Sequence, residues 1–300
     1  MTTHAHAKAA GPFVSRKLRD CEEAIRAAAP RVVADADDEA IHDLRVAIRR
    51  LRTLLKMSRK LFGRWHADVV RRAFADVMRA TGELRDEEVL EETLEVVSAE
   101  PSFVAWLGAR KARERKLRRA VVARLERGDL DRARLLLKAL LVFPVPPKSD
   151  IELARFARRV VDRAHRGVET KRDVAPDDAL GLHELRIAYK ELRYSIELLS
   201  EALPIDQRAM LEPATVFQKR LGEIHDADVA IEVVRQAKKL PEGVRDAALA
   251  ALAELREKRL KKYLRELDPL AETDRELHET RVEPAEVDPS DAPTTTNGSN

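Results

Sequence analysis

The longest regular pattern of hydrophobic and polar positions in the chain lies between His42 and Phe62. Its hydrophobic residues recur at steps of four, three and four, as one buried face of an α-helix requires. They are Leu44, Ile48, Leu51 and Leu55. Basic residues recur with similar spacing and form a second stripe along the edge of the first. We call this stripe the cationic ladder: His42, Arg45, Arg49, Arg52, Lys56 and Arg59.

The cationic ladder has two interpretations, a solvated surface or a surface that binds an anion. A solvated basic face ordinarily interleaves acids four residues from its bases, but Asp43 is the only acid between residues 42 and 62. From Arg45 to Arg59 the ladder is about 21 Å long, which suits an extended anion. Repulsion within the ladder calls for a compensating anion, from another part of the chain or from outside it.

Other segments show the same helical periodicity. It predicts helices over residues 15–33 and 65–78, and Pro101 is suited to begin a long helix with a basic run at residues 110–119. Only 10 glycines and 4% aromatic residues accompany 36% charged residues, a balance typical of amphipathic helices. The 44% hydrophobic content is enough for a buried core. We therefore expect an all-α protein.

Charge and cysteine usage limit the setting in which the protein works. The net charge is only +3, but residues 282–300 carry four acids and no base, so residues 1–281 carry +7. The single cysteine, Cys21, excludes an internal disulfide and a cysteine zinc cluster. The sequence has neither an apolar leader nor a stretch of about 18 uninterrupted apolar residues. We expect a cytoplasmic protein with no membrane partner and no cofactor.

The second half of the chain repeats three landmarks of the first. Residues 183–193 repeat the pattern of residues 42–52 at an offset of 141. The segment LGEIHDADV repeats TGELRDEEV at an offset of 140, and a late basic segment repeats at an offset of 143. Landmarks in the same order and at the same spacing indicate an internal duplication. The predicted fold is all-α, with two tandem four-helix bundles related by a pseudo-twofold.

Composition also predicts the boundaries between these parts. The segment VFPVPPK, residues 142–148, contains three prolines that a helix interior would not tolerate. Beyond Asp268 the composition shifts to Pro, Glu, Asp and Thr, which is typical of disorder. The predicted organisation is a disordered N-terminus (1–12), a first bundle (13–143), a linker (144–148), a second bundle (149–270) and a disordered acidic tail (271–300).

The twin motif HDLRVAIRRLR at residues 42–52 and HELRIAYKELR at residues 183–193 resembles the CHAD family, the conserved-histidine α-helical domains. The resemblance spans residues 13–270 and includes the GELRD and GEIHD landmarks. It implies paired four-helix bundles with a basic central cavity that binds inorganic polyphosphate, and association with polyphosphate granules and their proteins. The Glu-x-Glu-x-Lys strand of the CYTH domains to which the family is often fused is not found, so the chain resembles a stand-alone member.

The resemblance also implies a set of polyphosphate-binding residues. Some match the twin motif, and the others lie near the landmarks or on the late basic segments. They are His42, Arg45, Arg49, Arg52, Lys56, Arg79, Arg118, His183, Arg186, Lys190, Arg193, Lys219 and Lys261. Guanidinium groups suit this ligand because their paired N–H groups contact two phosphate oxygens at once.

The histidines of the twin motif, His42 and His183, have three interpretations. They can donate hydrogen bonds to phosphate and bind it more strongly as the pH falls. They can play a structural role in the first turn of each helix. A metal role together with Asp43 and Glu184 is the third, although the ligand spacing does not favour it.

The two copies differ in charge. Glu191, Glu197, Ser200 and His225 of the second copy stand where the first has Arg50, Lys56, Arg59 and Arg85, respectively. We therefore expect the first copy to supply more of the attraction for an anion.

Two other functions are alternatives to polyphosphate binding. A nucleic-acid-binding protein would use the same basic helix, but aromatic residues are few and no homeodomain, finger or basic-zipper pattern occurs. A polyphosphate-processing phosphohydrolase would need metal-holding carboxylates or a Walker loop. Asp86 with Glu88 and Asp226 with Asp228 are the nearest candidates, but acids at a helix start are the commoner explanation. We expect a protein that is not an enzyme and has no metal site.

Overall fold

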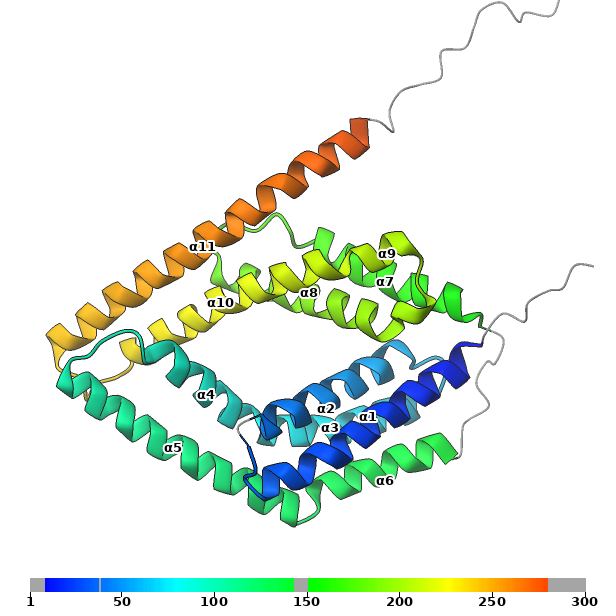
Figure 1. Cartoon of the computed structure of the whole chain (residues 1–300), viewed down its shortest axis with the longest axis horizontal. Helices are drawn as coiled ribbons and strands as arrows, with labels where there is room; N and C mark the ends of the chain where they lie inside the picture. Colours follow the sequence, from blue (N-terminus) through cyan, green and yellow to red (C-terminus); the bar gives the residue numbers. More distant parts are fainter. Residues whose placement is uncertain (1–8, 38, 143–150, 280–300) are drawn as a thin grey trace, which may run out of the picture. The chain divides into compact units, whose positions relative to one another are not determined.

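The computed structural model describes residues 9–37, 39–142 and 151–279, and these residues are helical with no β-strand (Figure 1). The all-α prediction is therefore confirmed. The helices are α1 (Ala10–Val33), α2 (Ala40–Met57), α3 (Arg64–Ala80), α4 (Gly82–Leu94), α5 (Pro101–Glu126), α6 (Asp129–Val142), α7 (Leu153–Glu169), α8 (Ala179–Leu199), the 3-10 helix η1 (Ser200–Ala202), α9 (Ile205–Ala209), α10 (Leu211–Arg235) and α11 (Glu242–Glu279).

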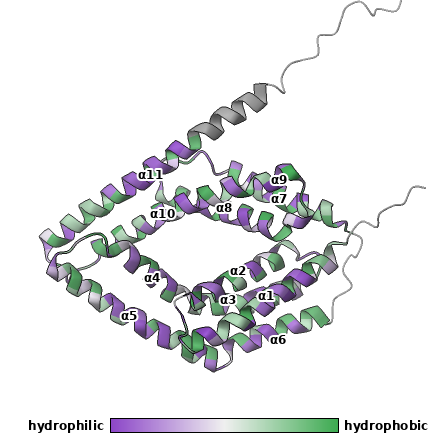
Figure 2. Cartoon of the chain, viewed as in Figure 1, coloured by the Kyte–Doolittle hydropathy of each residue, from purple (hydrophilic) through white to green (hydrophobic). Residues whose placement is uncertain are grey.

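Helix α2 is the helix of the cationic ladder, and its hydrophobic stripe is buried as predicted. All four stripe residues, Leu44 to Leu55, have no exposed surface. They pack against α1 and α3, which flank α2 in the chain. Along the other helices, too, hydrophobic and hydrophilic residues alternate (Figure 2). The burial of one stripe fixes the rotation of α2 about its axis, so the ladder must face away from this core.

Two helix ends differ from the prediction. Helix α1 begins at Ala10, before the predicted disordered segment ends, because Ala10, Phe13 and Val14 are buried. It also continues through Pro30 to Val33, since a proline in the last turns removes only one backbone hydrogen bond. Helix α11 extends to Glu279, so the start of the predicted tail is helical. Residues 271–279 are rich in Ala, Glu, Arg and Leu, which favour helix. The predicted linker at residues 144–148 lies outside the described residues.

The two halves of the chain share a hydrophobic core. It joins the ends of α4 and α10 with α5 and the start of α11. Its members are Leu90, Leu94, Phe103, Leu107, Ala230, Val234, Ala237, Leu240, Ala248 and Leu252. This shared core places both halves in one compact unit, residues 1–260, and residues 261–300 form a second unit.

The halves also differ in how their helices are divided. In the first half, α3 ends at Ala80 and α4 begins at Gly82, with Thr81 between them. The corresponding segment of the second half is the continuous helix α10. Within the described residues, the first half carries α1 to α6 and the second α7 to α11, rather than four helices each.

Candidate polyanion-binding site

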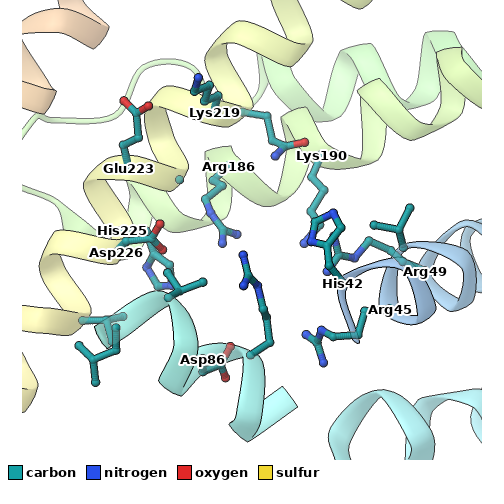
Figure 3. Close-up of a pocket in the computed structure, with 17 residues that line it drawn as sticks. His42, Arg45, Arg49, Asp86, Arg186, Lys190, Lys219, Glu223, His225 and Asp226 are labelled. Atoms are coloured by element: carbon teal, nitrogen blue, oxygen red, sulfur yellow. The ribbon is translucent and has the colours of Figure 1, made fainter. Parts of the chain in front are cut away.

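A cavity of about 560 Å³ lies between α2, α4, α8 and α10 (Figure 3). We call it the central cavity. It is lined by His42, Arg45, Val46 and Arg49 of α2, by Arg85, Asp86, Val89 and Leu90 of α4, by Arg186 and Lys190 of α8, and by Gln218, Lys219, Gly222, Glu223, His225, Asp226 and Val229 of α10. Six of these side chains are Arg or Lys and three are carboxylates, so the central cavity is basic. The residues come from both halves of the chain.

Corresponding arginines of the two halves face corresponding glycines. Helix α2 carries Arg45, whose Nη1 atom would lie 3.9 Å from a methyl group built on Gly82. Helix α8 carries Arg186, whose Nε atom would lie 3.8 Å from a methyl group built on Gly222. A small residue at each landmark leaves room beside the guanidinium group. The glycines of the GELRD and GEIHD landmarks thus lie beside the first arginine of each twin motif.

Backbone and side-chain oxygens at the α3–α4 junction hold Arg45 in place. Its Nη1 atom donates to the carbonyl oxygen of Met78 at 3.1 Å and to Oγ1 of Thr81 at 2.9 Å. Thr81 is buried and lies at the break between α3 and α4. Burial, followed by the charge of Arg49, lowers the pKa of Arg45 to about 10. The guanidinium is therefore fixed in an orientation by neutral acceptors, with the charges of Asp86 and Glu88 acting on it without forming an ion pair in the described residues.

Lys190 lies among arginines from both halves. Its ammonium group points toward α2 (Figure 3). Arg49 of α2 donates a 3.2 Å hydrogen bond to the hydroxyl oxygen of Tyr194. Burial, followed by the charges of Arg49 and Arg186, lowers the pKa of Lys190 to about 7. Burial likewise lowers the pKa of Arg186. The free protein thus holds several cations in a partly desolvated cluster whose members repel one another.

The histidine at the start of the second motif is paired with another histidine. Nδ1 of His183 lies 3.3 Å from Nδ1 of His225, with ring centroids 4.4 Å apart. Burial and the charge of Arg186 lower both pKa values, that of His225 to about 4. Both rings are therefore neutral near pH 7, and His225 rather than His183 lines the central cavity. His42 lines it directly and is exposed.

Three carboxylates of the central cavity lie on α4 and α10. Asp86 and Asp226 occupy matching places in the two landmarks, and Glu223 lies one turn before Asp226 (Figure 3). Burial raises the pKa of Asp226, against the opposing charges of Arg186 and Arg259. Helix α4 begins at Gly82, so Asp86 lies in its second turn, and the interpretation of Asp86 as a helix-start acid is wrong.

Two residues at the C-terminal end of the cationic ladder form ion pairs: Arg59 with Asp68 of α3, and Lys56 with an acid of the second half. Lys56 lies 2.7 Å from a carboxylate oxygen of Glu191. Glu197 lies 3.2 Å from Arg193 and 3.7 Å from Arg50. Glu191 and Glu197, two of the acids that make the second copy less basic, therefore lie against Lys56 and Arg50 of α2. Only the upper rungs, His42, Arg45 and Arg49, face the central cavity.

Of the other sequence-predicted residues, Arg52, Arg79, Arg118 and Lys261 are not among those that line the central cavity. Arg118 is held by Asp35 and Glu88 at 3.1 Å and by Glu114 at 2.9 Å. Arg79 pairs with Asp76 at the surface, and Arg52 is half-buried, with its Nε atom lacking a hydrogen-bond partner. Lys261 is an exposed residue of the second unit. Lys219 does line the central cavity, with Arg186 and Lys190.

The twin-motif residues alone did not identify Arg85, His225 and Gln218 as residues of the cavity wall. The first two are the fourth residues of the GELRD and GEIHD landmarks, three positions after the glycine that faces an arginine. One turn of helix separates these positions, so they share a face. Gln218 has no comparable signal, and only the packing of α10 brings it to the cavity.

Among the described residues, no group of three or more His, Cys, Asp or Glu side chains lies close enough to hold a metal ion. None of the described helices combines the length and hydrophobicity that a membrane span requires.

The sequence matches a protein-family model, and the structure is similar to solved structures. A model of the CHAD domain family matches residues 16–235. The structure is similar to the crystal structure of the CHAD domain from the plant Ricinus communis, with a TM-score of 0.69 and 22% identity over 87% of this chain and 92% of that one. It is also similar to PptA from Streptomyces chartreusis, with a TM-score of 0.64 and 16% identity over 87% of this chain and all of that one. No curated protein matches the sequence.

Proposed function

The chain belongs to the CHAD family, and we propose that it binds inorganic polyphosphate in the central cavity without catalysing a reaction. The family is associated with polyphosphate-related proteins. The observation that carries the proposal is a group of four cations, two from each half: Arg45, Arg49, Arg186 and Lys190. Within the described residues, none of the four has an ion-pair partner. Their repulsion is relieved when an anion with many charges enters.

We also infer that the two halves are copies of one ancestral unit. The matching contacts of Arg45 with Gly82 and of Arg186 with Gly222 support this inference, because the paired residues are separated by the same offsets as the sequence landmarks. The proposed pseudo-twofold brings one cationic wall from each copy to the central cavity. A linear ligand without direction in its chemistry suits a site of this kind.

The shape and chemistry of the central cavity favour polyphosphate over a nucleic-acid duplex. A cavity of about 560 Å³ is of small-molecule size, and four helices line it. Polyphosphate is a chain of phosphates without bases, so charge-assisted N–H donors suffice to bind it. Nucleic-acid binding would need an exposed surface that follows a duplex, or aromatic platforms for a single strand.

Competition and salt dependence test the choice of ligand. Long-chain polyphosphate is expected to displace fluorescent duplex DNA at physiological salt, while DNA does not displace labelled polyphosphate. With six cavity cations and about 0.7 counterions released per contact, the log of the dissociation constant should rise with log salt at a slope of about 4. Stronger binding of DNA would reject the proposal.

A phosphohydrolase remains the enzymatic alternative, with Asp86 and Asp226 as its candidate acids. We expect no sustained release of orthophosphate when the purified protein is incubated with polyphosphate and magnesium. The measurement is a colorimetric phosphate assay, with an active polyphosphatase as positive control. Release that the Asp86→Asn variant abolishes would show that the protein is an enzyme.

Granule association is the cellular part of the proposal. A fluorescent fusion of the protein is expected to co-localise with stained polyphosphate granules. The fusion carrying Arg49→Glu and Lys190→Glu should be spread evenly, because the proposed site brings the protein to the granule. Granule localisation of this variant at equal abundance would show that another surface, or a granule-associated protein, recruits it.

A further inference from the structure

Helix α7 carries five arginines on one exposed face. Their spacing of i, i+3, i+4, i+8 and i+11 places them on the side opposite its buried residues, which include Phe156 and Val161. We call them the α7 arginine face: Arg155, Arg158, Arg159, Arg163 and Arg166. All five are exposed, and they span about 16 Å along the helix. The α7 arginine face is therefore a linear array of positive charge.

Two carboxylates of α7, Asp162 and Glu169, lie on the same side of the helix as the five arginines, so positive charges outnumber negative ones on this face. In the described part of the chain, no carboxylate forms an ion pair with any of the five arginines. Asp162 lies among them, but its Oδ1 atom accepts a 2.6 Å hydrogen bond from Gln207. Glu169 lies 3.6 Å from His165 instead. This face differs from the lower cationic ladder, where acids of α8 supply the counter-charge.

One arginine of this face meets the lower end of the cationic ladder. A small cavity of about 170 Å³ between α2, α7 and α8 is lined by Arg163 together with Lys56 and Arg59. Lys56 lies seven residues after Arg49 on α2, a rise of about 10 Å. Arg163 thus lies beside the lower end of the cationic ladder, in a cavity that Glu191, the partner of Lys56, also lines.

The chemistry of the α7 arginine face selects among anionic partners. No large hydrophobic residue is exposed on α7. A helix that lies on a membrane inserts hydrophobic side chains between the lipids, and a single-stranded nucleic acid stacks its bases on aromatic rings. Neither feature is present on this face. A flexible chain of phosphates requires only donors at intervals, which the five guanidinium groups supply.

We propose that the α7 arginine face is a second polyanion-binding surface, which holds the part of a long polyphosphate chain that extends beyond the central cavity. This inference rests on the proposed function, since the chain it binds is the ligand of the cavity. The second surface makes the affinity for polyphosphate depend on the length of the polyphosphate chain. Short chains occupy the central cavity alone, whereas long chains gain further contacts on α7.

A five-fold substitution tests the inference. The variant replaces all five arginines of the face by glutamine, which removes the charge and preserves helix propensity. The control replaces five exposed cations that are scattered over α1, α3 and α6 by glutamine: Arg19, Arg26, Arg64, Arg72 and Lys138. Binding of tripolyphosphate and of long-chain polyphosphate is measured by calorimetry, and helix content by circular dichroism. Anionic phospholipid vesicles form a parallel arm.

The expected result is a loss of affinity that depends on chain length. The five-fold variant should bind long-chain polyphosphate at least about tenfold more weakly, with a reduced salt slope, and should bind tripolyphosphate like the unsubstituted protein. The control should retain its affinity for both chains. Unchanged long-chain affinity, or an equal loss for both chains, would overturn the inference and leave the proposed function standing. Loss of vesicle binding alone would assign the face to a membrane. Failure of the unsubstituted protein to bind either chain would reject the proposed function itself.

Discussion

Reversing the charges of Arg49 and Lys190 together is expected to reduce polyphosphate affinity at least about a hundredfold. Each charge-assisted hydrogen bond contributes about 1.5–3 kcal/mol, so losing two corresponds to two or more orders of magnitude in the dissociation constant. The variant carries Arg49→Glu and Lys190→Glu. In the unsubstituted protein both side chains lie in a cluster of like charge. The two glutamates therefore replace repulsion by attraction toward Arg45 and Arg186. Helix content measured by circular dichroism should therefore be retained.

A control with the same change of net charge separates this local effect from long-range attraction. Arg19→Glu and Arg26→Glu reverse two exposed charges of α1 that do not line the central cavity. We expect this control to change the affinity less than about threefold at physiological salt, where the Debye length is about 8 Å. If the control and the cavity variant lose affinity equally, the protein binds polyphosphate through its overall charge rather than in the central cavity.

Replacing Lys190 by methionine is expected to stabilise the protein and to weaken polyphosphate binding. A half-buried lysine among four arginines destabilises the free fold, and methionine keeps the length of the side chain without its charge. The arginines whose charges act on Lys190 are Arg45, Arg49, Arg186 and Arg193. We expect the thermal midpoint at pH 7 to rise by at least about 2 °C, the shift that about 1 kcal/mol produces in a protein of this size. Lys219→Met, at an exposed position of the same cavity, is the matched control for stability.

The gain in stability from Lys190→Met should depend on pH, and the direction of this dependence follows from the pKa of Lys190. Because the pKa of Lys190 in the folded protein is about 7, below its ordinary value of 10.5, only the unfolded chain holds this proton between these pH values. Stability of the unsubstituted protein therefore rises with pH across this window. The advantage of Lys190→Met should be largest near pH 7 and should shrink on approach to about pH 10. Thermal melts at several pH values measure it, and a constant advantage would contradict the half-buried, deprotonating lysine.

The same proton should be taken up when the ligand binds. A phosphate chain beside Lys190 favours the charged form, so polyphosphate binding above pH 7 is accompanied by protonation. Calorimetry in buffers of different ionisation enthalpy should detect this uptake in the unsubstituted protein and less of it in Lys190→Met. The affinity of the unsubstituted protein for polyphosphate should accordingly fall as the pH rises above 7.

The sequence predicted those features that depend on local periodicity. The buried stripe of α2 and the position of the cationic ladder follow from helix geometry, which is set by neighbours three and four residues apart. The internal repeat and the resemblance to the CHAD family were also visible, and the match over residues 16–235 confirmed the resemblance. Six of the thirteen predicted binding residues line the central cavity, among them Arg45, Arg49 and Arg186.

The tertiary structure alone decided which basic residues remain without a counter-charge. Lys56 and Arg49 share one stripe of α2, but the docking of α8 pairs Lys56 with Glu191 and leaves Arg49 beside Lys190. His183 meets His225, which is 42 positions away in the sequence. Contacts of this kind depend on how helices cross, and periodicity along one helix does not encode the partner. For this protein, the sequence therefore determined the helices and their charged faces, and the packing of those helices determined which charged faces are open to an anion.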